Sequence, residues 1–433
     1  MANLENLDRT ATIARDLIRF DTSNWGEGKA NPERPAAEYV QSLLKDLNIE
    51  SEIFDSAPGR SNLIARIAGT NSELAPLIIH GHLDVVPAVA SEWSVDPFAG
   101  VIQDGYLWGR GAIDMKHMVA MMIASLERIL KNGKLPNRDI IFALFADEEA
   151  GGAFGSHYMV EHYPEFFVGA EAAISEIGGY SITANDQRVY LLQTAEKALV
   201  WMNLSVTAEP AHGSLVHKNN AVSILAEAVM KIANYEWPVN LTGTTKVMFS
   251  ELKRILGLNP ESSVKELLDV LGENSKVISA SFQNTSNPTG LSAGYKHNVI
   301  PSTASATIDI RTIPGHEAEV ISTIKKLVGP EVEISFANQD IGLEESFMSP
   351  IAQKAKELLL RHDPGAEVVP LMISGGTDNK ALKKLGISGY GFAPLQMPDD
   401  LNFSKLFHGI DERIPLAALE FGTAVLTDLI LEF

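Results

Sequence analysis

Residues 76–84 read Pro76-Leu-Ile-Ile-His80-Gly-His82-Leu-Asp84, an apolar run that ends in two histidines and an acid. The apolar part predicts a buried strand of the parallel type. Alternation along a strand aims His80 and His82 at the same side, and one of them can bind a metal ion. Asp84 is well placed to accept the other ring proton of that histidine and so to fix its tautomer. The alternative for either histidine is a hydrogen-bonded position in the core.

A second cluster, Gly109-Arg-Gly-Ala-Ile-Asp114, is a glycine-rich turn that ends in an acid. After this turn, the apolar residues between Met115 and Leu130 keep helical spacing. Asp114 is therefore either a metal ligand or a side chain that only caps the helix, because aspartate is a favoured N-cap residue.

A third cluster, Asp147-Glu148-Glu149, follows a second predicted strand at residues 139–146 without a break. Three adjacent acids repel one another, and a solvated loop is the usual place for such a run. At the carboxyl end of a central strand, a divalent cation or a shared proton explains it better. The three clusters together indicate a bound cation where strands end and loops begin.

Composition narrows the class of protein. At 433 residues the chain is too long for one small core, which suggests two domains or one domain with a large insertion. The lack of cysteine excludes disulfides, thiolate zinc sites and a cysteine nucleophile. The first residues do not resemble a signal peptide and no apolar run is long enough to span a membrane, so we expect a cytoplasmic protein without a membrane partner. The net charge of −20 argues against a nucleic-acid partner.

Apolar strands alternate with amphipathic helical stretches over most of the chain, which is an α/β pattern. Between about 187 and 345 the predicted strands alternate apolar and polar residues, which suggests an antiparallel sheet with one covered face. The strands predicted in this region are 189–193, 199–206, 279–283 and 304–311, and the predicted helices are 221–235 and 317–328.

The clusters resemble the sequence blocks of the co-catalytic zinc metallopeptidases, the family of aminoacylase, succinyl-diaminopimelate desuccinylase, glutamate carboxypeptidase, carboxypeptidase S and carnosinase-type dipeptidases. The resemblance spans nearly the whole chain, and its three metal blocks are 80–87, 109–116 and 147–152. It implies that His82 binds one zinc ion and that Asp114 bridges two. It also implies that Glu148 is the general base and that Glu149 binds the second zinc ion.

The same resemblance implies two further ligands. Glu176 follows a predicted strand and precedes two glycines after one intervening residue, and it would join His82 on one zinc ion. His408 lies near the C-terminus and would join Glu149 on the other. Taken alone, either residue could be structural. The cofactors implied are two divalent metal ions, zinc in the first place, with cobalt or manganese as alternatives.

The family's architecture implies a zinc-peptidase-like catalytic domain, residues 1–186 and 346–433, with a mostly parallel central sheet flanked by helices. The resemblance assigns residues 187–345 to an inserted α+β lid and dimerisation domain. Residues 236–278 exceed the common lid and are similar to the carboxypeptidase S-like branch. His212, in an Ala-His-Gly-Ser block, resembles the histidine that stabilises the oxyanion and often reaches the active site of the partner subunit in a homodimer. The alternative is a simple turn histidine.

Two further blocks resemble the part of the family's pocket that holds the substrate carboxylate. Asn298 would lend polar contacts, and Arg311 offers a guanidinium fork suited to bidentate binding. Arg311 could instead make a structural ion pair. Gly375, Gly376 and Thr377 resemble the loop that lines this pocket, although such a loop alone is only a turn signal.

The chain departs from the family pattern at two places. Ala198 stands where the family often has a glycine after a Glu-Lys pair, which weakens a close subgroup assignment. Asn379 and Lys380 stand where many relatives have a small residue and an arginine, so the pocket chemistry there stays open.

These observations predict metal-dependent hydrolysis of an amide or peptide bond in a small substrate with a free carboxylate, such as an N-acyl amino acid, a dipeptide or a C-terminal residue. A water between two metal ions roughly 3.5 to 4 Å apart would lose a proton to Glu148, and His212 would stabilise the oxyanion. One alternative is a non-catalytic metal-binding relative, which has no need for Glu148 beside Glu149. The other is a strict aminopeptidase, which Asn298 and Arg311 disfavour.

Overall fold

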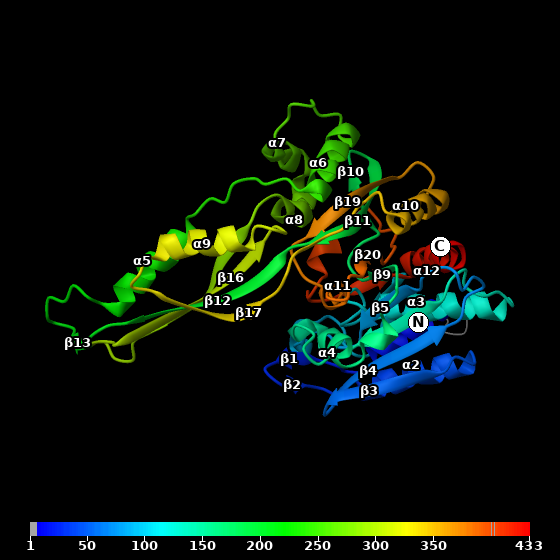
Figure 1. The fold of residues 1–433 in the computed structure, drawn as a ribbon, viewed down its shortest axis with the longest axis horizontal. Helices are drawn as coiled ribbons and strands as arrows, with labels where there is room; N and C mark the ends of the chain where they lie inside the picture. Colours follow the sequence, from blue (N-terminus) through cyan, green and yellow to red (C-terminus); the bar gives the residue numbers. More distant parts are fainter. Residues whose placement is uncertain (1–6, 400, 402) are drawn as a thin grey trace.

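The computed structural model describes residues 7–399, 401 and 403–433, which form a broad body and an elongated arm (Figure 1). The body contains a ten-stranded sheet in the order β10-β11-β20-β9-β5-β8-β4-β3, with β18 and β19 also paired to β11. Its strands are β3 (Ser51–Ala57), β4 (Arg60–Ile67), β5 (Leu77–His82), β8 (Ile140–Phe145), β9 (Ala172–Ser175), β10 (Tyr180–Ala184), β11 (Gln187–Glu196), β18 (Leu343–Glu344), β19 (Glu367–Ile373) and β20 (Ser388–Gly391).

The centre of the body sheet is parallel. β5 pairs in parallel with β8 and β9, and β9 pairs in parallel with β20, whereas β4 and β3 extend the sheet antiparallel. Every residue of β5 and β8 is buried, as expected for strands that are covered on both faces. The predicted α/β fold with a parallel central sheet is confirmed.

Helices cover both faces of this sheet. On one face, α3 (Lys116–Lys131) packs between α1 (Arg9–Ile18) and α12 (Leu416–Glu432) and is buried on nearly all sides. On the other face lie α4 (Ser156–His162) and α11 (Asn379–Lys383). They pack against every second side chain of the strands, those that point to this face. This arrangement leaves the carboxyl ends of the parallel strands free to carry a site.

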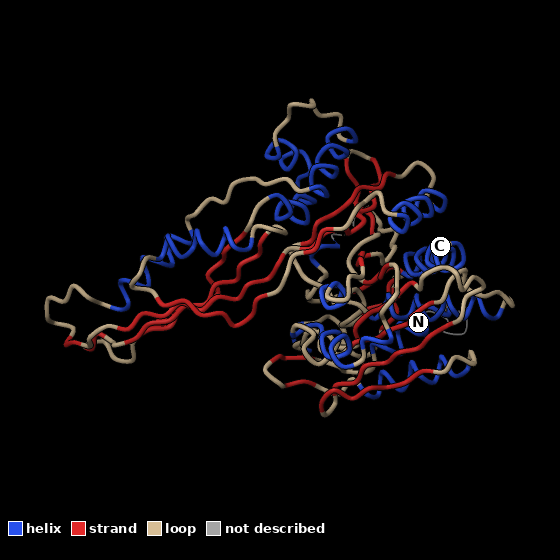
Figure 2. The backbone as a smooth tube through the Cα atoms, in the orientation of Figure 1, coloured by secondary structure: helices blue, strands red, loops and turns tan. Residues whose placement is uncertain are grey.

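The arm is a separate antiparallel sheet in the order β14-β16-β12-β17, drawn as a long narrow ribbon in Figure 2. Its strands are β12 (Ala198–Thr207), β14 (Thr285–Ala293), β16 (Thr303–Thr312) and β17 (Glu333–Gln339). Helices α5 (Ala221–Ala233) and α9 (Glu317–Val328) cover one face, where their apolar side chains form a core with β12 and β16. The predicted antiparallel sheet with one covered face is therefore confirmed.

The strand predicted at 279–283 is wrong. Ser279–Phe282 form the short 3-10 helix η6, and β14 begins only at Thr285. Both Ser281 and Phe282 are buried, because the Ser281 hydroxyl donates to the Met372 carbonyl at 2.5 Å while Phe282 packs in the apolar core of the body. The alternating pattern therefore reflects a tight turn against β19 rather than a strand.

The long segment 236–278 folds onto the body and not onto the arm sheet. It forms α6 (Gly243–Ile255), α7 (Val264–Leu271), η5 (Gly272–Asn274) and α8 (Ser275–Ile278). Met248 and Leu252 of α6 and Leu267 of α7 belong to the body core, and α6 contacts β19. The apolar stripe of each helix thus extends the cover of the body sheet.

Strand β11 also belongs to the body, although it lies within the segment 187–345 expected to form the inserted domain. It pairs in parallel with β19 and antiparallel with β10 and β18. By sheet membership, the chain passes from the body into the arm at Lys197 and returns between Gln339 and Leu343.

The remaining elements are short connections or helices at the edges of the two units. They are β1 (Asn24–Gly26), β2 (Lys29–Ala30), α2 (Arg34–Asp46), η2 (Ala90–Glu92), β6 (Val101–Gln103), β7 (Tyr106–Trp108), η3 (Glu148–Ala150), η4 (Pro164–Phe166), β13 (Ala211–His212), β15 (Val299–Ile300), α10 (Pro350–His362), η7 (Phe403–Lys405) and β21 (Arg413–Pro415). Within the described residues, no helix is both long and apolar enough to cross a membrane.

Candidate metal centre

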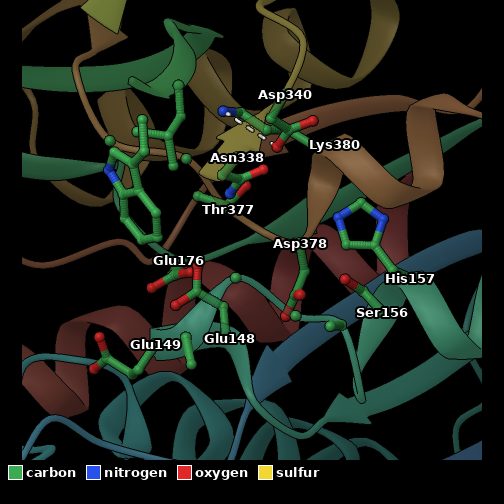
Figure 3. Close-up of a pocket in the computed structure, with 18 of the residues that line it drawn as sticks. Glu148, Glu149, Ser156, His157, Glu176, Asn338, Asp340, Thr377, Asp378 and Lys380 are labelled. Carbon is green, nitrogen blue, oxygen red and sulfur yellow. Dashed lines mark ion pairs between the residues drawn. The ribbon is translucent and has the colours of Figure 1, made fainter. Parts of the chain in front are cut away.

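Acidic and histidine side chains gather where three neighbouring parallel strands end. His82 closes β5, the Glu148–Glu149 pair follows β8, and Glu176 follows β9. All three glutamates line one cavity, and Figure 3 shows the carboxylates of Glu148 and Glu176 next to each other, with Glu149 below them. The carboxyl ends of adjacent parallel strands meet at one edge of a sheet, which explains why residues far apart in sequence come together here.

The first group of possible ligands consists of His82, Asp114 and Glu176. The His82 Nε2 atom lies 3.1 Å from Asp114 Oδ1 and 3.3 Å from Glu176 Oε2. All three residues are buried. One imidazole nitrogen and two carboxylate oxygens therefore converge on one point, as a divalent ion requires.

The second group consists of Asp114, Glu149 and His408. The His408 Nε2 atom lies 3.2 Å from Asp114 Oδ2 and 3.1 Å from Glu149 Oε2. Asp114 thus presents one carboxylate oxygen to each group, which is the arrangement of a bridging ligand. The alternative that Asp114 only caps the helix does not hold, because α3 begins at Lys116 and its N-cap is Met115.

The charges of this site fit a divalent cation. Burial raises the pKa of Glu148, Glu149 and Glu176, and neighbouring carboxylates add to the effect. Glu148 is affected by Glu176, and Glu149 and Glu176 are affected by Asp114. Several buried carboxylates this close together are stabilised by a positive charge between them.

Asp84 supports the site differently from our prediction. The His82 Nδ1 atom donates to the backbone carbonyl of Asp84 at 2.9 Å, whereas the Asp84 carboxylate is 3.5 Å away. That carboxylate instead accepts the backbone N–H groups of Glu148 at 3.1 Å and Glu149 at 3.2 Å. The turn after β8 presents these two donors, so the Asp84 side chain faces the turn while its carbonyl fixes the imidazole tautomer.

His80 takes the other of the two roles considered for a strand histidine. Its Nε2 atom lies 2.9 Å from Asn379 Oδ1, and its ring is fully buried. Burial lowers the pKa of His80 to about 4, so the ring is neutral. His80 is therefore a core residue that ties β5 to α11.

A cavity of about 790 Å³ opens from the candidate metal centre. The predicted residues Arg311, Gly375, Gly376 and Thr377 line it, together with Glu148. Thr377 donates its N–H (3.0 Å) and hydroxyl (2.6 Å) to a buried glutamate of the body, Glu196. The predicted loop therefore lines the cavity, and its hydrogen bonds to Glu196 fix it to the body.

Arg311 also makes the ion pair that was considered as its alternative role. Its Nε and Nη2 atoms donate to Asp309 at 2.7 and 3.0 Å, and its Nη1 atom donates to the Ser374 carbonyl at 3.2 Å. The guanidinium carries five N–H donors, so these three contacts leave others that can face the cavity.

His212 and Asn298 lie apart from the metal centre of their own chain. Both are at the far tip of the arm, where β13 and β15 pair (Figure 1). They are neighbours, since the Gly213 N–H donates to the Asn298 carbonyl at 2.9 Å. His212 is exposed, and its Nδ1 atom lies 2.8 Å from the Ser214 hydroxyl.

Several cavity residues were not assigned a role from the sequence. Asp378 is buried beside the glutamates, and burial raises its pKa to about 7. Lys380 donates to the Lys197 carbonyl at 3.0 Å and lies 3.6 Å from Asp340, as the dashed line in Figure 3 shows. The unusual Asn-Lys pair after Asp378 was a sequence signal for this part of the pocket. Asp340 lies where the chain returns from β17 to the body, and it belongs to no motif.

Comparisons with known proteins agree with this geometry. Residues 78–432 match the family model described as Peptidase family M20/M25/M40. The chain is 30% identical to the N-fatty-acyl-amino acid synthase/hydrolase PM20D1 of Xenopus tropicalis, over 94% of this chain and 82% of that protein. It is 29% identical to a probable carboxypeptidase S-like 2 protein of Dictyostelium discoideum, over 82% and 71% of the two chains.

The fold also agrees with a solved structure of this family over nearly the whole chain. The crystal structure of an M20 family metallo-carboxypeptidase, Sso-CP2 from Sulfolobus solfataricus, superposes with a TM-score of 0.75 at 19% identity and covers 98% of this chain and 99% of that one. The family match includes all the residues of both candidate metal groups. The non-catalytic alternative is therefore excluded: the chain is a metallohydrolase of amide or peptide bonds and belongs to Peptidase family M20/M25/M40.

Proposed function

We propose that the enzyme hydrolyses the amide bond next to a free carboxylate in a small substrate, either an N-acyl amino acid or a short peptide. The observation that supports this most is the pair of three-residue ligand groups that share Asp114, with Glu148 beside them at the cavity. A panel of N-acetyl amino acids, dipeptides and peptides blocked at the C-terminus tests the proposal. Activity on the blocked peptides alone would contradict it and would favour a strict aminopeptidase.

Two divalent ions, zinc in the first place, would be held by the two groups, and when bound they would polarise the scissile carbonyl and make water more acidic. Glu148 would take the proton of the attacking water and deliver it to the leaving amine. Its Oε2 atom lies 4.0 Å from His82 Nε2, close to the first group but outside the three atoms that converge there. Glu149 contributes its oxygen to the second group, so the two neighbours have different roles.

The substrate carboxylate would bind to Arg311 and to the loop of Gly375, Gly376 and Thr377. These residues line the same cavity, where Arg311 donates to the carbonyl of Ser374 next to Gly375 and is held in place by Asp309. A guanidinium with free N–H donors binds a carboxylate in a defined orientation. The amide bond would then lie between this anchor and Glu148.

We expect the enzyme to prefer short acyl groups. Among the described lining residues, the large apolar side chains are Ile177, Leu199 and Trp201. Charged residues occupy much of the remaining wall, including Glu161, Asp340, Lys380 and Lys384. A long acyl chain gains about 0.8 kcal/mol for each buried CH₂ group only where apolar surface receives it.

The value of kcat/KM for N-acetyl-methionine should therefore exceed that for N-dodecanoyl-methionine by at least about tenfold. Both substrates are measured below the micelle concentration of the longer one, by release of free methionine. N-acetyl-methionine amide serves as a control that lacks the carboxylate and should be a poor substrate. Faster hydrolysis of the dodecanoyl compound would contradict the expected preference.

Metal content tests the shared ligand. The purified enzyme should hold about two zinc, cobalt or manganese ions per chain, because two groups share one carboxylate. Asp114→Ala should lose both ions, since Asp114 belongs to both groups, whereas Glu176→Gln should weaken one of them. Elemental analysis after mild dialysis measures this. Full activity with a single ion per chain would contradict the bridging role.

We further propose that the arm acts as a lid and forms a homodimer, and that His212 completes the site of the partner subunit. Large apolar side chains near His212 are exposed, namely Leu215, Val216 and Tyr295. Exposed apolar groups in one place mark an interaction surface, and the edge strands β14 and β17 can pair with a symmetry mate. A partner would cover this surface and explain why His212 lies far from its own metal centre.

A further inference from the structure

The side-chain amide of Asn24, on the short strand β1, lies between two buried carboxylates. Its Nδ2 atom donates to Asp84 Oδ2 at 2.8 Å and to Asp147 Oδ1 at 3.0 Å. Asn24 is 4% exposed, and the two aspartates are 0% and 4% exposed. One amide group thus supplies a hydrogen to each of two like charges in a place that water barely reaches.

The two carboxylates hold the turn that carries Glu148 and Glu149. Asp84 accepts the backbone N–H of each glutamate. Asp147 starts the turn in the left-handed conformation (φ 64°), and its Oδ2 atom accepts the Phe154 N–H at 3.2 Å. A shift of either carboxylate would therefore move the backbone from which the Glu148 side chain projects.

Asn24 itself is held firmly. Its Oδ1 atom accepts the Gly26 N–H at 3.0 Å, which orients the Nδ2 atom toward the carboxylates. Its backbone N–H donates to the Val85 carbonyl at 2.9 Å, and the Val85 N–H donates to the Thr22 carbonyl at 3.2 Å. The β1 segment therefore pairs with the segment that follows β5, and these contacts hold the Asn24 amide in place between the carboxylates.

An amide suits this position and a carboxylate does not. A third acid would add repulsion between buried like charges, and an apolar residue would remove one donor from each of the two carboxylates. Asp147 has further support from Arg60, whose Nη2 atom lies 3.6 Å from Asp147 Oδ1 and which also pairs with buried Glu33. Without the amide, Asp84 would keep the N–H groups of Glu148 and Glu149, and Asp147 would keep the Phe154 N–H and Arg60.

We propose that Asn24 is a positioning residue for the reaction: its amide separates the carboxylates of Asp84 and Asp147, and these keep the Glu148 turn in the orientation that proton transfer needs. This inference rests on the proposed role of Glu148. Asn24 lies outside the three metal blocks that carry the family resemblance, and no predicted site residue precedes it in the chain.

Kinetics of Asn24→Ala test the proposal. We expect kcat to fall about 10- to 100-fold, the usual effect of losing an outer-shell partner, with KM, metal content and melting temperature close to those of the wild type. Asn137→Ala is the matched control, because Asn137 donates to the Phe433 carbonyl at 3.0 Å, before the start of β8, whereas Asp147 follows the end of that strand. It should change kcat little.

A second substitution separates positioning from mere space filling. In Asn24→Ala/Asp147→Asn, one of the two like charges is absent, so the double variant should recover part of the lost kcat. Asn24→Ser, which keeps a single donor, should have an intermediate kcat and provides the comparison if Asn24→Ala does not fold. A wild-type kcat in Asn24→Ala, or a double variant slower than the single one, would overturn the proposal.

Glu148→Gln is measured in the same series. If it loses activity while Asn24→Ala keeps it, only the positioning role of Asn24 fails. If Glu148→Gln retains full activity, the proposed function itself fails, whatever Asn24→Ala does.

Discussion

Glu148→Gln is expected to keep both metal ions and to lose at least about 10²-fold in kcat, the lower range for general acid-base catalysis. The glutamine has nearly the same shape but cannot accept the proton of the attacking water. The Glu148 carboxylate lies beside the first metal group, and the groups of converging atoms are complete without it. Single-turnover kinetics and elemental analysis on the same preparation measure both parts of this expectation.

Glu149→Gln is the matched control, because it makes the same chemical change at the neighbouring residue. Glu149 lies 3.1 Å from His408 Nε2 in the second group, so this variant should lose occupancy of one metal site. Added metal should restore part of its activity, whereas added metal should not restore Glu148→Gln. Equal loss of metal in both variants would contradict the division of roles between the two glutamates.

His212→Ala is expected to lower kcat by about 10² to 10³-fold with little loss of metal, as removal of an oxyanion donor does. The expectation depends on a dimer, since His212 lies at the tip of the arm, away from the metal centre of its own chain (Figure 1). Removal of a contact made only in the transition state lowers kcat and kcat/KM together. Steady-state kinetics and metal analysis test this.

Mixing inactive His212→Ala chains with inactive Glu148→Gln chains decides where His212 acts. In a mixed dimer with function across the interface, one site has both defects and the other is intact, so activity should return after subunit exchange. Mixtures of each variant with itself are the control and should stay inactive. Heterodimers that form but remain inactive, or a fully active monomer in sedimentation, would show that His212 does not act on the partner subunit.

Local sequence patterns predicted much of the fold, and the resemblance to the zinc peptidases implied the residues of the candidate metal centre. The apolar strands that end at His82 and Ala146 lie side by side in the body sheet. The clusters indicated a cation site, the resemblance to the zinc peptidases implied which residues would share it, and the structure brings Asp114, Glu149 and His408 together. This was possible because the periodicity of a strand, its burial and the residue types that bind metal can all be recognised in short stretches of sequence.

Other features depended on tertiary structure alone. Ser279–Phe282 has the alternation of a strand but packs as a turn against the body, and segment 236–278 covers the body sheet. The carboxylate of Asp84 faces the Glu148 turn because the turn presents two N–H donors, which the spacing to His82 did not reveal. Each of these outcomes depends on partners that are distant in sequence.

Three further residues have positions that depend on partners distant in sequence: Asn24, Asp340 and His212. Asn24 reaches two carboxylates through the pairing of its segment with Val85, and Asp340 reaches the cavity because the chain re-enters the body beside Lys380. His212 has a recognisable block around it, yet the arm carries it away from its own metal centre. The sequence by itself determined which side chains can bind metal and transfer protons, because that depends on residue type and local spacing. Only the tertiary structure decided which side chains meet, because sheet order and the direction of the arm set the distances between segments.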